Sequence, residues 1–155
     1  MNWVQFVVQW LHVLLAITWF GYTIAMYFLV IPPLATLPEG QQRDINVRLG
    51  ERSGRVMPFI ALGVLLLGII RGTFLGQVQS FDALTSAYGI TWLVALVVTI
   101  AITVNGARNL GPGFLALKDA PDFAAAAMKV RGFARIDLVL FAIAFSCMIL
   151  MRFGY

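Results

Sequence analysis

The sequence predicts an all-α protein, a polytopic membrane four-helix bundle with both termini on the outer side. Three observations lead to this fold class. The 155 residues are 61% hydrophobic and only 12% charged, unlike the composition of soluble domains. Four apolar helices, expected at about 3–30, 56–75, 88–106 and 121–153 of one transmembrane domain, are each long enough to cross about 30 Å of hydrocarbon. Basic residues are concentrated in two of the connections, which sets the orientation.

The first expected helix, residues 3–30, carries a polar stripe. Side chains three or four positions apart share a helix face, which aligns Gln5, Gln9, His12, Ala16, Trp19 and Thr23. Such a stripe in a membrane helix faces the bundle interior or a cavity, so His12, the only histidine, is expected to point inward. It lies roughly 14 Å along the helix, near the middle of the bilayer. Two interpretations stay open, a hydrogen bond to a neighbouring helix and iron ligation in a haem pocket.

The connections differ in charge. Basic residues fill the connection between the first two helices and the one before the fourth, namely Arg43, Arg48, Arg52, Arg55, Arg108, Lys118, Lys129 and Arg131. The connection between the second and third helices holds one charged residue, Asp82. Because basic loops stay in the cytoplasm, both termini and the Asp82 loop are expected outside. The basic clusters are expected to contact anionic lipid and not nucleic acid.

The second expected helix, residues 56–75, combines spaced glycines with a basic residue. A separate short surface helix is expected before it, over 43–55. The glycines recur at intervals of four, a spacing that lets a partner helix or the edge of a flat macrocycle approach closely: Gly68, Gly72 and Gly76. Arg71 lies at the outer end, where it either snorkels to the interface or pairs with an acid such as a propionate.

The third helix, residues 88–106, presents three threonines on one face, which indicates an inner face. Tyr88 and Trp92 lie at its outer end and are interpreted as interfacial aromatic residues without a functional role.

The fourth helix, residues 121–153, is expected to begin in water and to carry an acid, Asp137, about one turn inside the hydrocarbon. An acid at this depth is a candidate functional residue, and the favoured interpretation is an interfacial ion pair with a nearby arginine such as Arg131. Met148 and Met151 lie at the outer end and are interpreted as packing residues.

Several function classes find no support in the sequence. Cys147 is the only cysteine, which excludes an intrachain disulfide and a CxxC motif. We find no nucleophile–base pair, phosphate loop or paired carboxylates, so hydrolase and nucleotide-dependent activities are not indicated. One histidine, one cysteine and scattered methionines make a poor copper site.

The stretch LHVLLAITWFG, with His12, Trp19 and Gly21, resembles the opening of a superfamily of small four-helix membrane proteins. These are the copper-resistance CopD-like proteins and the bacterial HemJ-type protoporphyrinogen oxidases. ERSGRVMPFIALGVLLLG is similar to their basic loop and second helix, and RGFARIDLVLF to the entry of their fourth. The resemblance implies that His12 ligates haem b, that Asp137 occupies the acidic position of the last helix, and that the protein lies in a bacterial inner membrane.

The expected function is therefore that of a cytochrome b-like haem protein with a redox or electron-transfer role, whose cofactor site includes His12, Arg71 and Trp19. HemJ-type enzymes carry a lysine early in the third helix, where this chain has Thr91 or Trp92, so protoporphyrinogen oxidase activity is not expected. The sixth coordination position of the iron would be weak or open, or it would be filled by a methionine or by a second chain. We expect a homo-oligomer or a subunit of a membrane complex. The alternatives are a non-enzymatic accessory or assembly subunit and, with less support, copper handling.

Overall fold

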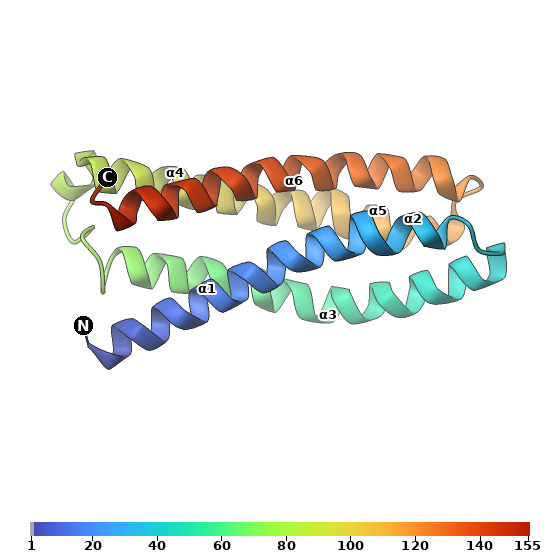
Figure 1. Ribbon diagram of the computed structural model, residues 1–155, viewed down its shortest axis with the longest axis horizontal. Coiled ribbons are helices and arrows are strands. Elements are labelled where there is room, and N and C mark those ends of the chain that lie inside the picture. Colours follow the sequence, from blue (N-terminus) through green and yellow to red (C-terminus); the bar gives the residue numbers. More distant parts are fainter. Residues whose placement is uncertain (1) are drawn as a thin grey trace.

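A computed structural model describes residues 2–155 as a bundle of long helices (Figure 1). The elements in chain order are α1 (Trp3–Ile24), η1 (Ala25–Val30), α2 (Ile31–Leu34), α3 (Glu39–Gly72), η2 (Asp82–Thr85), α4 (Ala87–Asn105), η3 (Gly106–Leu110), α5 (Gly111–Ala116), η4 (Leu117–Asp119) and α6 (Phe123–Arg152). No strand occurs among these residues, which confirms the all-α prediction.

Four helical stretches are long and apolar enough to cross a membrane: Trp3–Leu34, Glu39–Gly72, Ala87–Asp119 and Phe123–Arg152. Large apolar side chains are exposed on the outer faces of all four, for example Ile17, Phe59, Val97 and Val139. Because a soluble protein rarely exposes so much apolar surface, these faces suit contact with lipid. The chain is thus a four-helix membrane bundle, as predicted.

Three of the four helical stretches run farther than the sequence indicated, since the first reaches Leu34, the second begins at Glu39 and the third reaches Asp119. The separate surface helix expected over 43–55 is wrong, because α3 is one helix that passes through Pro58. The ring of a helical proline crowds the carbonyl four residues earlier, which here belongs to Gly54. In the first stretch, a π-helical segment, η1, is followed directly by α2, which contains Pro32 and Pro33.

The helices pack as two pairs that follow each other in sequence. The strongest helix contacts join α1 to α3 and α4 to α6. Both termini and the connection 73–86 lie at one end of the bundle, which we call the terminal end (Figure 1). The opposite end, which we call the basic end, carries the turns 35–38 and 120–122.

A large apolar cluster closes the bundle at the basic end. It draws buried residues from η1, α2, η3, α5, η4 and α6: Met26, Tyr27, Ile31, Leu34, Leu110, Phe114, Leu117, Phe123, Ala127, Val130 and Ala134. A smaller cluster lies farther toward the terminal end and consists of Ala16, Trp19, Ala61, Val64, Ile102 and Phe141. Beyond this second cluster the two helix pairs are separated by a cavity.

Candidate functional site

The cavity at the terminal end has a volume of about 810 Å³ and is lined by α1, α3, α4 and α6 together with the start of the connection after α3. This volume lies within the range of about 300–1,000 Å³ that is typical of sites for small molecules and cofactors. Trp19, Ile102 and Phe141 form its floor, where the indole of Trp19 meets the ring of Phe141 edge-on at 5.4 Å between centroids. The space is therefore large, mostly apolar, and closed toward the basic end.

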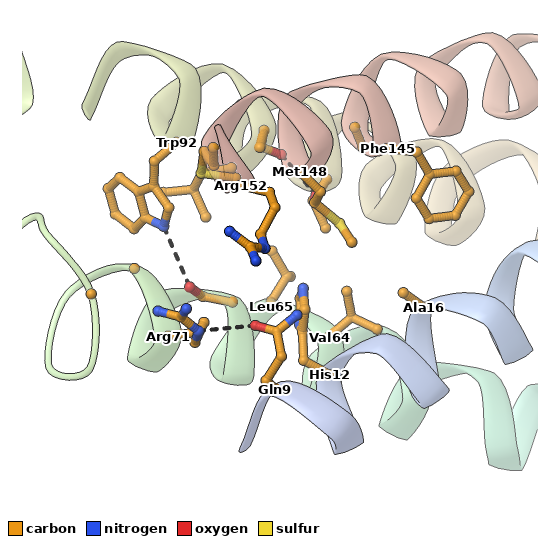
Figure 2. Close-up of a pocket in the computed structure, with 18 of the residues that line it drawn as sticks. Gln9, His12, Ala16, Val64, Leu65, Arg71, Trp92, Phe145, Met148 and Arg152 are labelled. Carbon is orange, nitrogen blue, oxygen red and sulfur yellow. Dashed lines mark hydrogen bonds between the residues drawn. The ribbon is translucent and has the colours of Figure 1, made fainter. Parts of the chain in front are cut away.

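His12 projects from α1 into this cavity (Figure 2). Its ring rests on Gly68 of α3, where an added Cβ would lie 3.2 Å from Cε1 of the imidazole. The buried Nδ1 has no hydrogen-bond partner within residues 2–155. An unpaired buried ring nitrogen is costly. The backbone of Val64 on α3 lies close enough to the imidazole to act as a hydrogen-bond partner, so a bond to a neighbouring helix stays open beside iron ligation.

Two arginines enter the cavity from opposite walls (Figure 2). On one wall, Nε of Arg71 donates to Oε1 of Gln9 at 2.9 Å and Nη1 donates to the carbonyl of Leu75 at 3.3 Å. On the other wall, Arg152 reaches in from the last turn of α6. Neither arginine forms a salt bridge within the described residues, and no acidic side chain lines the cavity there.

These two arginines stand apart from the other basic residues of the chain. All other lysines and arginines lie within 43–55 and 108–135, whose charges belong to the basic half of the bundle. Arg71 and Arg152 are therefore not explained by the rule that places basic residues on one side of a membrane. A pair of cations without an acidic partner, in a largely apolar cavity, fits a ligand that carries two negative charges.

The glycines of α3 make room for side chains of the site. Nε1 of Trp92 donates to the carbonyl of Gly68 at 3.3 Å, and a Cβ at Gly72 would lie only 1.9 Å from that same nitrogen. The interpretation of Trp92 and Tyr88 as interfacial aromatic residues without a site role needs correction, because both line the cavity. The packing of α4 in the bundle turns them inward, which their position in the sequence does not reveal.

Asp137 lies outside the cavity, in a separate polar cluster. Its side chain is almost fully buried, and Oδ1 accepts a hydrogen bond of 2.7 Å from Nδ2 of Asn105. Asn105 in turn accepts one of 2.8 Å from Asn109. The expected interfacial ion pair is wrong, since Asp137 forms no salt bridge within residues 2–155. The register of α6 places Asp137 on the face that packs against α4, whereas Arg135 points outward and is exposed.

The structure thus brings three of the predicted site residues, His12, Arg71 and Trp19, around one cavity and leaves Asp137 elsewhere. The sequence interpretation missed Arg152 and favoured a packing role for Met148, although both line the cavity. A signal for them was present, because the cavity-lining residues of α6 recur every three or four positions, namely Phe141, Ala144, Phe145, Met148, Met151 and Arg152.

Neither a cluster of metal-ligand side chains nor a known relative adds to this description of the cavity. Within residues 2–155 no group of three or more His, Cys, Asp or Glu side chains is arranged to hold a metal ion, so copper handling gains no support. No protein-family model, curated protein or solved structure matches the chain.

Proposed function

We propose that the protein is an integral membrane haem b protein with a redox or electron-transfer role, in which His12 ligates the iron. The observation that carries the proposal is the cavity itself. It combines an imidazole whose buried Nδ1 has no partner with two arginines that have no acidic partner in the described residues. Haem b offers one group for each, an iron atom for the imidazole and two propionates for the arginines.

The residues that line the cavity match this group in chemistry. The macrocycle would lie between the two helix pairs, with apolar walls supplied by Leu65, Leu96 and Phe145. Gln9 holds Arg71 at the level of the cavity mouth through its hydrogen bond, so the guanidinium is oriented before a ligand arrives. When bound, the haem would supply one-electron chemistry at its iron. The chain would contribute a ligand for the iron, cations for the propionates and an apolar surrounding that tunes the reduction potential of the iron.

The resemblance to the CopD-like and HemJ-type proteins supports the same proposal. It also leads us to propose the bacterial inner membrane as the location, with both termini outside. Cysteine labelling at Ser80, Arg48 and Lys118 in a background without Cys147 tests the orientation. Label that reaches Ser80 but not Arg48 or Lys118 from outside the cell is expected. External access to Arg48 would reverse the orientation.

A redox role implies a partner for electron exchange. Because the cavity lies in the terminal half of the bundle, we propose that this partner acts there, either as another subunit of a membrane complex or as a second copy of the chain. Protoporphyrinogen oxidation is not proposed, because the lysine of the HemJ-type third helix has no counterpart here. Complementation of a strain that lacks this step should fail.

The central experiment is an absorption spectrum of the purified protein, expressed with ample haem, before and after dithionite. A Soret band that shifts on reduction is expected for the wild type. His12→Ala should abolish it, and free imidazole should restore part of it by occupying the vacated position. Thr23→Ala is the matched control, because Thr23 belongs to the same stripe of α1 but does not line the cavity.

Two outcomes would overturn the proposal in different ways. A colourless wild type would exclude a haem protein and favour the accessory-subunit alternative. A coloured wild type whose spectrum survives His12→Ala unchanged would keep the haem but remove His12 as its ligand.

A further inference from the structure

We propose that Met148 is the second axial ligand of the haem iron, on the wall opposite His12. This inference rests on the proposed function and identifies the residue that completes it. A single histidine can fill one axial position, so six-coordinate iron needs a donor from the other helix pair. Met148 lies on α6 across the cavity from His12 (Figure 2).

The level of Met148 along its helix matches that of His12. On the α1 wall, His12 lies one turn deeper than Gln9, the residue that holds Arg71. On the α6 wall, Met148 lies one turn deeper than Arg152. If the two arginines mark the level of the propionates, both walls place their candidate ligand about one helical turn, or roughly 5 Å, farther in. The two ligands would then meet the same iron from opposite faces.

Other donors on the opposite wall are less suitable. The hydroxyl of Thr99 donates to the carbonyl of Ala95 at 2.7 Å within its own helix. The indole nitrogen of Trp92 bonds to Gly68 and has no lone pair for a metal. Cys147 is buried but does not line the cavity.

Met151 also lines the cavity, but it lies one position from Arg152, at the level expected for the propionates. Of the two methionines, Met148 is therefore the better candidate ligand, because its thioether lies deeper in the cavity. It is a soft ligand for haem iron, and its flexible side chain allows it to reach the metal.

The test compares haem-loaded wild type with Met148→Leu and with the matched control Met151→Leu. Leucine keeps nearly the volume of methionine, so packing changes little. The ferric wild type should be low-spin and show the weak far-red band of a thioether bound to iron. Met148→Leu should lose this band, become high-spin and show a lower midpoint potential, because methionine ligation raises the potential. Met151→Leu should match the wild type in all three readouts.

A gain-of-signal variant makes the test independent of folding losses. Met148→His should remain low-spin but lack the thioether band, since a second imidazole would replace the thioether. The inference is overturned if the band survives in Met148→Leu, if it is lost in Met151→Leu instead, or if the wild type is high-spin. In each of these cases haem bound through His12 would still stand. A wild type without haem would overturn both proposals together.

Discussion

The two ends of the bundle are built from the same helices but hold them together differently. At the basic end, side chains from neighbouring elements interlock, and Ile31 and Leu117 are 0% and 1% exposed. At the terminal end, the facing positions of the two helix pairs carry small residues such as Ala16, Gly68 and Ala144, and a cavity of about 810 Å³ remains between them. The difference teaches that side-chain size at facing positions decides whether four helices form a core or a binding site.

The π-helical segments lie at the boundary between these regions. Both η1 and η3 begin on the basic side of the cavity floor, one in each helix pair. A wide π turn changes the face that a helix presents beyond it. Each helix pair can therefore present small and polar residues to the cavity on one side of the boundary and large apolar residues to the core on the other.

The largest expected effect is a difference between the two ends in how much a substitution lowers the free energy of unfolding. Leu117→Ala at the basic end should lower the free energy of unfolding by about 3 kcal/mol, because it opens a void in a closed cluster. Leu96→Ala on the cavity wall should cost only about 1 kcal/mol, because Leu96 already faces empty space. Unfolding in mixed detergent micelles, followed by circular dichroism, measures both. Equal losses would contradict the distinction between a packed and an open end.

The next effect concerns the polar cluster between α4, η3 and α6. Asn105→Ala should cost about 2 kcal/mol, because the amide donates to Asp137 and to the carbonyl of Phe133 and accepts from Asn109. Thr103→Ala is the control, since its hydroxyl bonds only to the carbonyl of Thr99 within its own helix. The same unfolding assay applies. If both variants lose the same small amount, the cluster does not hold these elements together.

A third effect should appear in ligand binding and not in folding. Arg71→Gln and Arg152→Gln should each weaken haem retention about tenfold, the loss expected for one charge-assisted hydrogen bond. Arg55→Gln should leave retention unchanged, because this side chain is exposed and does not line the cavity. Titration of the haem-free protein with haem gives the three affinities. Wild-type affinity in both cavity variants would remove the propionate assignment.

The smallest effect compares two glycines of α3. Gly54→Ala should raise stability by up to about 1 kcal/mol, because a Cβ there meets nothing within 4 Å and alanine favours the helix. Gly68→Ala should gain nothing and should shift the Soret band, because the added methyl presses on the His12 ring. Unfolding and absorption spectra together check the pair. An unshifted band would mean that the added methyl group does not move the His12 ring.

The sequence reveals the fold more completely than the site. Long apolar stretches have few solutions in lipid other than helices, so four spans and the inward stripe of His12 could be predicted. The lining role of Trp92 could not, because it depends on which helices pair and in which rotation. The same reason explains Asp137, whose expected depth near the membrane surface indicated an ion pair with a nearby arginine, whereas packing against α4 gave it an amide partner.

The sequential pairing of the helices also sets an order of assembly. Residues 3–72 supply His12 and Arg71, and residues 87–152 supply the opposite wall, so neither hairpin contains a complete site. During synthesis the first hairpin enters the membrane before the second exists. The cavity therefore comes into being only when the second hairpin docks, and any cofactor must be captured at or after that moment, from the bilayer or from the terminal side. Under the proposed function, haem would therefore be bound only after insertion, once the two hairpins have docked.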